Sequence, residues 1–151
     1  MRINLLTPGF TTSNGSAFLF PFVVHKRALK EAQFDIRFVN RSSPGITDCD
    51  VLGIDSKEFR SGWKDESKTE TLELISSYSS RANKLVWFDT TDSSGTLQEQ
   101  VIPLVDNYLK SQLLADKSRH TSKIYGGRVI SEYYRDTAGI EDEVGGALDE
   151  P

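Results

Sequence analysis

A short apolar run that ends abruptly in a polar loop is the feature that most constrains the fold of this chain. Residues 85–88 read Leu-Val-Trp-Phe, and residues 89–95 then supply two carboxylates, four hydroxyls and a glycine. A strand buried in a parallel sheet has such a continuous apolar run instead of an alternating pattern. Since open α/β sheets bind ligands beyond the carboxyl ends of their strands, the polar loop is where we expect a site.

Apolar runs and amphipathic stretches alternate along most of the chain. This order predicts an α/β fold with a Rossmann-like parallel sheet and helices on both faces. Besides the run at 85–88, we expect strands at residues 3–6, 34–39 and 51–54, and helices at about 16–32, 69–82 and 96–117. The last helix is predicted from an apolar stripe with a proline near its start, formed by Val101, Pro103, Val105, Tyr108, Leu109 and Leu113.

The remaining segments carry three further expectations. Residues 1–140 are predicted to form one domain of ordinary size, and the acidic residues 141–151 to form a tail or a linker remnant. Residues 59–68 are polar and are expected to form a surface connection. His25 is expected on the helix face that covers the sheet, and not in a catalytic role.

Composition and charge narrow the classes of function. The 151 residues are 37% hydrophobic and 26% charged, which is typical of a soluble globular protein. The formal net charge of −4 gives no electrostatic attraction to nucleic acid or to an anionic membrane. The single cysteine, Cys49, excludes an internal disulfide and a cysteine-based metal cluster. No apolar run of about 18 residues predicts a membrane span, and the apolar start is too short for a signal peptide, so the cytoplasm is the expected location.

The loop after the first strand is where a Rossmann fold usually binds phosphate. Residues 7–16 read Thr-Pro-Gly-Phe-Thr-Thr-Ser-Asn-Gly-Ser. They contain neither the Gly-x-Gly-x-x-Gly fingerprint nor a P-loop lysine, so we expect no nicotinamide, flavin or other cofactor. The loop is suited to hydrogen-bonding a polyhydroxylated or anionic ligand, and the alternative is an ordinary connection between a strand and a helix.

Asp89 and Asp92 are the candidate chemical groups of the polar loop. Either carboxylate can act as a base, hydrogen-bond sugar hydroxyls or help to hold a metal. A metal would need further oxygen ligands, and we expect none. The alternative is that both aspartates, with Ser93 and Ser94, cap the helix that follows. The sequence contains no Gly-x-Ser-x-Gly nucleophile motif at this place.

Three blocks of the sequence carry a resemblance to a known family. The first is the order of strand, Gly-Ser loop, helix and strand in residues 1–39, and the others are residues 87–96 and 125–128. Together they resemble the amino-terminal domain of bacterial glycosyltransferases of the GT-B type, in particular glycosyltransferase-like proteins of surface-polysaccharide biosynthesis. The resemblance covers about residues 1–140.

The resemblance implies a function in the synthesis of a carbohydrate polymer. In such enzymes the carboxyl-terminal domain binds the donor nucleotide, and the amino-terminal domain faces the acceptor. This chain is then expected to be an isolated or truncated acceptor-side domain, inactive alone. Its expected partners are a sugar or glycan acceptor and a second donor-binding domain or chain. We also expect weak self-association through a face near Phe10, Trp87 and Tyr125.

The resemblance also implies roles for individual residues. Asp89 or Asp92 would deprotonate an acceptor hydroxyl. Arg128 would hold a phosphate, after two glycines that allow close approach, or would be an ordinary surface or ion-pair residue. The residues expected to bind the substrate are Asn14, Gly15, Ser16, Thr91, Ser94, Gly95, Tyr125, Gly126, Gly127 and Arg128.

The competing hypothesis is a non-catalytic α/β module that senses a ligand or binds another protein, since a fold alone does not fix function. Acidic residues at strand ends are also typical of phosphoacceptor receiver domains. Those domains need an acidic pair after the first strand, where this chain has Thr7-Pro8-Gly9, and a lysine late in the chain. We therefore expect no phosphoryl transfer to Asp55 or Asp89.

Overall fold

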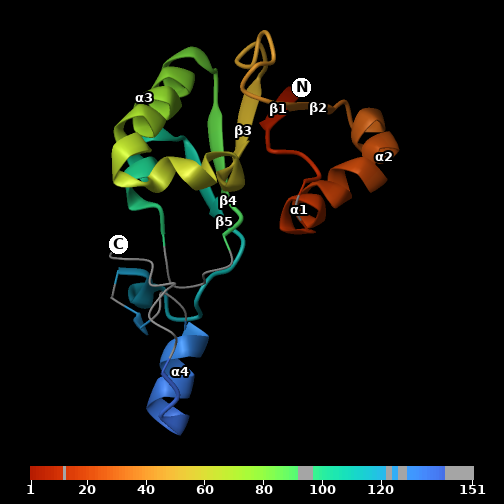
Figure 1. Ribbon diagram of the computed structural model, residues 1–151. Helices are drawn as coiled ribbons and strands as arrows, with labels where there is room; N and C mark the ends of the chain where they lie inside the picture. Colours follow the sequence, from red (N-terminus) through yellow and green to blue (C-terminus); the bar gives the residue numbers. More distant parts are fainter. Residues whose placement is uncertain (12, 92–96, 122–123, 126–128, 142–151) are drawn as a thin grey trace.

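The computed structural model describes residues 1–11, 13–91, 97–121, 124–125 and 129–141. Within these residues, five strands form one parallel sheet in the order β2-β1-β3-β4-β5 (Figure 1). The strands are β1 (Arg2–Leu6), β2 (Asp35–Val39), β3 (Val51–Asp55), β4 (Leu85–Asp89) and β5 (Asn107–Lys110). The predicted Rossmann-like parallel sheet is thereby confirmed.

Helical segments cover both faces of the sheet (Figure 1). On one face lie α1 (Ser13–Val24) and α2 (Lys26–Glu31). On the other face lie α3 (Asp65–Arg81) and the two 3₁₀ segments η1 (Ser56–Trp63) and η2 (Glu99–Leu104). Helices on both faces are what crossover connections between parallel strands require.

Successive residues of β4 pack against the helical layers on opposite faces of the sheet. Trp87 points toward η1, where its ring lies 5.8 Å from that of Phe59 and 6.3 Å from that of Trp63. The next residue, Phe88, points to the opposite face, where its ring lies 5.2 Å from that of Phe18 of α1. Strand side chains alternate between faces, so the continuous apolar run serves both layers.

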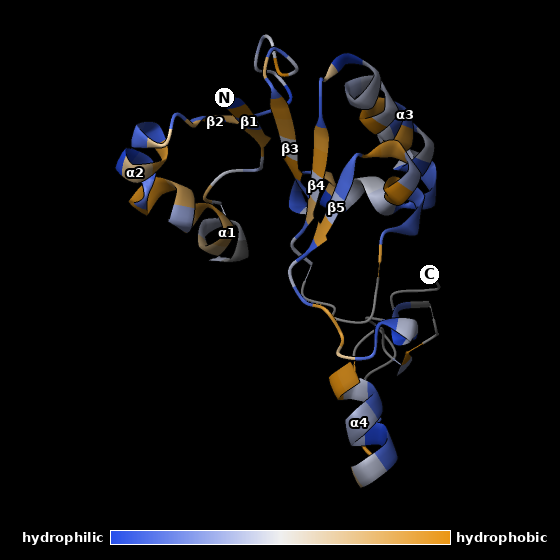
Figure 2. Ribbon diagram, turned by 180° about the vertical axis from the view of Figure 1, so that it is seen from behind, coloured by the Kyte–Doolittle hydropathy of each residue, from blue (hydrophilic) through white to orange (hydrophobic). Residues whose placement is uncertain are grey.

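The main hydrophobic core lies between the sheet and the α3 layer. Figure 2 shows the apolar residues concentrated in the strands and on the inner side of α3. Complete burial of a large apolar side chain contributes about 1.5–3 kcal/mol. The buried members of this core are Leu6, Ile46, Cys49, Leu52, Ile54, Phe59, Ile75, Tyr78, Leu85, Trp87 and Val101.

The α1 layer depends on a glycine in the sheet. A Cβ atom at Gly53 of β3 would lie 2.6 Å from Cδ2 of Leu5 and 2.8 Å from Cε2 of Phe88. Both distances are shorter than a carbon contact allows. The absence of a side chain at this position therefore lets Leu5 and Phe88 meet beneath α1.

The predicted helix at residues 96–117 is wrong. The structure has η2, then β5, and then η3 (Lys117–Thr121) in this region. Residues 107–110 alternate between exposed and partly buried, which is the period of a strand. Leu85 and Asp106 connect β5 to the sheet, because the Leu85 N–H donates to the Asp106 carboxylate at 2.7 Å and the Asp106 N–H donates to the Leu85 carbonyl at 3.0 Å. Pairing with β4 prevails over the helical spacing of the apolar residues.

Two smaller expectations are also wrong. Residues 59–68 are not merely a surface connection, because η1 occupies the first five and its Phe59 is fully buried. The helix expected at 16–32 is divided into α1 and α2 at His25, which is exposed and does not cover the sheet. The backbone of His25 has φ −94° and ψ 16°, which takes this residue out of the regular helix.

The chain continues beyond β5 into η3 and α4 (Val129–Ala138). α4 projects away from the carboxyl edge of the sheet and has no buried residue (Figure 1). The expected tail lies outside the described residues except for Glu141, so the domain limits stay a prediction. No helix in the described part of the chain is long and apolar enough to span a bilayer.

Candidate functional site

The strand order defines where a ligand is expected. β1 has β2 on one side and β3 on the other, so the direction of winding reverses between β1 and β3. Sheets with the order 2-1-3-4-5 bind ligands in the crevice beyond the carboxyl ends of the strands at such a switch point. Four polar side chains lie at or just after these ends: Thr7, Asp55, Asp89 and Lys110.

The first cluster is centred on Asp55 at the end of β3, whose carboxylate is 1% exposed. Its Oδ1 atom accepts hydrogen bonds from the Thr90 hydroxyl at 2.6 Å and from the Lys57 N–H at 3.1 Å. Its Oδ2 atom accepts from the Thr7 hydroxyl at 3.4 Å. The Ser56 hydroxyl accepts from the Thr90 N–H at 3.1 Å. These contacts join the ends of β1, β3 and β4.

The second cluster is centred on Asp89 at the end of β4, which is fully buried. Its Oδ2 atom accepts from the Tyr108 hydroxyl at 2.5 Å and from Nζ of Lys110 at 3.0 Å. Its Oδ1 atom accepts from the Thr91 hydroxyl at 2.5 Å and from the Thr91 N–H at 3.1 Å. The four contacts occupy both oxygens of the carboxylate.

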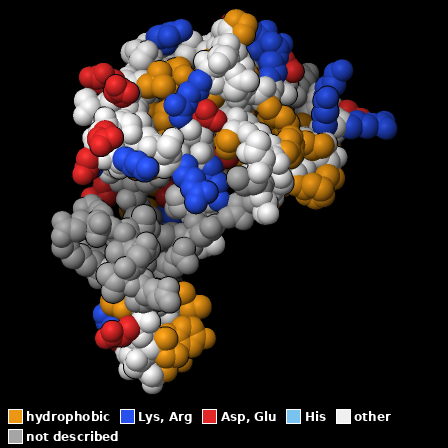
Figure 3. Space-filling model, viewed as in Figure 1, with side chains coloured by type: hydrophobic (Ala, Val, Ile, Leu, Met, Phe, Trp, Pro, Cys, Tyr) orange, Lys and Arg blue, Asp and Glu red, His pale blue; other side chains and the backbone are white. Residues whose placement is uncertain are grey.

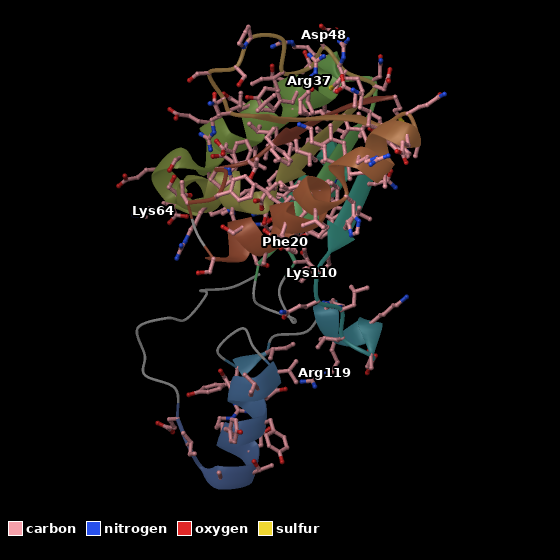
Figure 4. The ribbon with its side chains drawn as sticks, turned by 90° about the vertical axis from the view of Figure 1, so that its right-hand side faces the viewer. Phe20, Arg37, Asp48, Lys64, Lys110 and Arg119 are labelled. Atoms are coloured by element: carbon pink, nitrogen blue, oxygen red, sulfur yellow. The ribbon has the colours of Figure 1, made fainter. Side chains whose placement is uncertain are left out.

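Strand pairing itself assembles the second cluster. Trp87 pairs with Tyr108 and Asp89 with Lys110 in the register of β4 and β5. Paired residues of parallel strands point to the same face, so Asp89, Tyr108 and Lys110 must meet. Burial and the hydrogen bond to Asp89 raise the pKa of Tyr108 far above its usual value, so its hydroxyl remains a donor. Figure 4 shows Lys110 at the carboxyl end of the sheet.

This geometry fixes what Asp89 does in the structure. The carboxylate touches no solvent and its charge is compensated by Lys110, whose side chain is 2% exposed. It holds the first residues of the loop after β4, because both polar groups of Thr91 donate to it. Removing a proton from a ligand would require Asp89 to become accessible, so its role as a base stays a prediction.

The other predicted site residues fall into four groups. Thr91 lies in the Asp89 cluster, where its hydroxyl donates to Asp89, and its role in binding a substrate stays a prediction. The segment containing Asn14, Gly15 and Ser16 forms the start of α1, where the Ser16 hydroxyl donates to the Phe10 carbonyl at 3.4 Å. Tyr125 stacks against Arg135 of α4, 4.4 Å from the guanidinium carbon. Outside the described residues lie Asp92, Ser94, Gly95, Gly126, Gly127 and Arg128.

Sequence analysis did not assign Tyr108 and Lys110 to the site, because both lie in the segment predicted as a helix. The sequence feature that could have indicated them is the alternation Asn-Tyr-Leu-Lys at residues 107–110, which places Tyr108 and Lys110 on one face of a strand. Asp55 was recognised as the residue that ends a strand, but its contact with Thr90 required the three-dimensional arrangement of β3 and β4.

Within the described part of the chain, no group of three or more histidine, cysteine, aspartate or glutamate residues is placed to hold a metal. Comparisons with models of protein families, with curated proteins and with solved structures find no match to this chain. The fold and the site thus define a doubly wound α/β domain with a polar cluster at its switch point.

Proposed function

We propose that this chain is the acceptor-side domain of a glycosyltransferase-like protein of bacterial carbohydrate-polymer synthesis, and that its ligand is a sugar or glycan. The observation that carries the proposal is the gathering of Thr7, Asp55, Ser56 and Thr90 at the switch point of the sheet. Hydroxyl and carboxylate groups in fixed positions are suited to a polyhydroxylated ligand, which offers both donors and acceptors. The sequence resemblance supports the same class.

The charge of the site favours a neutral polyol over an anion at the Asp55 cluster. Among the described residues no ion pair involves Asp55, so no cation is in place beside it to receive an anionic ligand. Oδ2 has one partner at 3.4 Å and can accept a second hydrogen bond. Since Asp55 is 1% exposed, a sugar hydroxyl would reach Oδ2 after displacement of the side chains that cover it, as at Asp89.

The surface beside the site supports the need for a second domain or chain. On α1, Phe20, Val23 and Val24 are 63%, 47% and 54% exposed, and near the sheet edge Phe10 is 55% exposed. Figure 3 shows apolar side chains gathered over the α1–α2 region and on α4. Apolar surface of this kind is typical of protein contacts. Trp87, which we had also placed on this face, is fully buried.

The test is a titration of the chain with a panel of oligosaccharides and nucleotide sugars, followed by amide chemical shifts. We expect saturable shifts at Thr7, Asp55 and Thr90. Thr90→Val removes one hydrogen bond to Asp55 and should weaken binding by about fivefold, which corresponds to about 1 kcal/mol. Thr69→Val on the exposed side of α3 is the matched control. Shifts confined to other regions, or equal effects of the two variants, would refute the assignment.

A second candidate, a phosphoacceptor signalling module, is favoured by one observation. The strand order 2-1-3-4-5 is found in receiver domains as well, and Lys110 supplies a lysine late in the chain. Against it, the residues after β1 are Thr7 and Pro8 in place of an acidic pair, and Lys110 is bound to Asp89. We expect no incorporation from acetyl phosphate. Labelling of Asp55 or Asp89 would replace the glycosyltransferase proposal with signalling.

A further inference from the structure

A groove lies over η1, beside the Asp55 cluster but distinct from it. It is a shallow, open groove of about 450 Å³, lined by Lys57, Glu58, Arg60, Ser61 and Lys64. This volume falls within the range of about 300–1,000 Å³ that is usual for small-molecule sites. Three of the five lining residues are cations, although the net charge of the whole chain is −4.

The single acidic lining residue does not cancel this positive charge. Glu58 is already paired with Arg41, whose Nε atom lies 3.0 Å from Oε1, and the Arg41 guanidinium also donates to the Glu58 carbonyl. Arg41 in turn stacks on the ring of Phe59 at 4.4 Å, which holds the pair in place. The charge of Glu58 is therefore compensated from outside the groove.

Two cations of the groove, Arg60 and Lys64, are available to a ligand. Arg60 and Lys64 are exposed, and no ion pair involves either of them within the described part of the chain. Besides Glu58, the nearest acidic residues in the sequence are Asp65 and Glu66, in the first turn of α3, where the helix N-terminus stabilises negative charge.

The position of the groove relates it to the crevice of the sheet. η1 begins directly after Asp55, and the Lys57 N–H donates to the Asp55 carboxylate. Figure 4 shows Lys64 and Lys110 toward the carboxyl end of the sheet, whereas Asp48 lies at the opposite end. A ligand at the switch point can therefore extend a charged group into the groove.

We infer that the η1 groove binds the phosphate or diphosphate group of a ligand through Arg60 and Lys64. A guanidinium offers paired N–H donors to phosphate oxygens, and an ammonium adds a point charge. The Ser61 hydroxyl can donate to a further oxygen. The inference does not depend on the proposed glycosyl acceptor, because the groove and the Asp55 cluster consist of different side chains.

The test is a titration of the 151-residue chain with inorganic diphosphate, followed by amide chemical shifts, with sulfate as the competing anion. We expect saturable shifts in residues 57–64 that sulfate reproduces only at much higher concentration. Parallel titrations with uridine diphosphate and with geranyl diphosphate distinguish the source of the diphosphate. Tighter binding of the first indicates a nucleotide-linked ligand, tighter binding of the second a lipid-linked ligand, and each result supports the site.

Charge-removing variants make the test specific. Arg60→Gln/Lys64→Gln removes two exposed cations and should weaken diphosphate binding by about tenfold. Lys26→Gln/Lys30→Gln on α2 removes the same charge from the opposite layer and should leave the affinity within about twofold. Equal weakening by both variants would show a general charge effect and overturn the inference, as would shifts that lie only outside residues 57–64.

The proposed glycan site and the η1 groove share no side chain, so the experiments can refute one proposal without refuting the other. Loss of glycan shifts at Thr90 with diphosphate binding intact would remove the proposed function and leave the groove. Loss of diphosphate binding with glycan shifts intact would remove the groove alone.

Discussion

Replacement of Lys110 by methionine tests whether the buried ion pair with Asp89 holds the carboxyl edge of the sheet. Both side chains are almost completely buried, and Nζ of Lys110 lies 3.0 Å from Oδ2 of Asp89. Methionine keeps most of the apolar stem of lysine but removes the charge. Asp89 is then left as a buried carboxylate without a cation, which usually costs about 3–5 kcal/mol.

The contacts that remain place the expected value at the lower end of this range. Asp89 keeps three hydrogen bonds, from the Tyr108 hydroxyl and from the hydroxyl and N–H of Thr91. We therefore expect Lys110→Met to lower the free energy of unfolding by about 3 kcal/mol. A domain with a typical stability of about 5–15 kcal/mol would remain folded and measurable.

The assay is urea unfolding followed by the fluorescence of Trp87 in the core and of Trp63 at the end of η1, whose rings are 6.3 Å apart. The double variant Asp89→Asn/Lys110→Met removes both charges and should be more stable than Lys110→Met by at least about 1.5 kcal/mol. Lys30→Met on the exposed surface of α2 is the control and should change stability by less than about 0.5 kcal/mol. A loss below about 1 kcal/mol for Lys110→Met, or no recovery in the double variant, would refute the reasoning.

Three further predictions follow from individual contacts. Gly53→Ala should lower the free energy of unfolding by about 1–3 kcal/mol, because the new methyl group would lie 2.6 Å from the Leu5 side chain; an unchanged urea midpoint would contradict this. Burial raises the pKa of Glu58, although Arg41 opposes the shift. Protonated Glu58 therefore contributes stability below its unfolded-state pKa, and this contribution is lost as the pH rises through its folded-state pKa. Unfolding measured between about pH 4 and 7 should therefore show Glu58→Gln gaining stability relative to the wild type as the pH rises, and a constant difference would be evidence against it. Phe20→Ser, at a side chain that is 63% exposed, should reduce concentration-dependent association in sedimentation experiments without lowering stability, whereas unchanged association would exclude α1 as the contact surface.

The sequence by itself determined the class of fold and the edge at which polar groups gather. Residues 51–54 and 85–88 are apolar runs bounded by polar residues, and residues 3–6 are apolar except for Asn4; each segment forms a strand of the parallel sheet. Their pattern is local, because a strand buried on both faces needs apolar residues at every position. The polar residues after these runs, Asp55 and Asp89, then had to lie at one edge of the sheet.

Only the tertiary structure decided the identity of the segment after β4 and the partners of the two aspartates. Tyr108 fits a helical stripe as well as a strand, and hydrogen bonds to β4 select the strand for Tyr108 and Lys110. The strand pairing also determines the surroundings of Asp89, which the sequence suggested as a base. In the register of β4 and β5, Asp89 is paired with Lys110, and the two side chains form a buried ion pair. Pairing between residues 21 positions apart depends on how the chain folds back on itself, and no local periodicity encodes it.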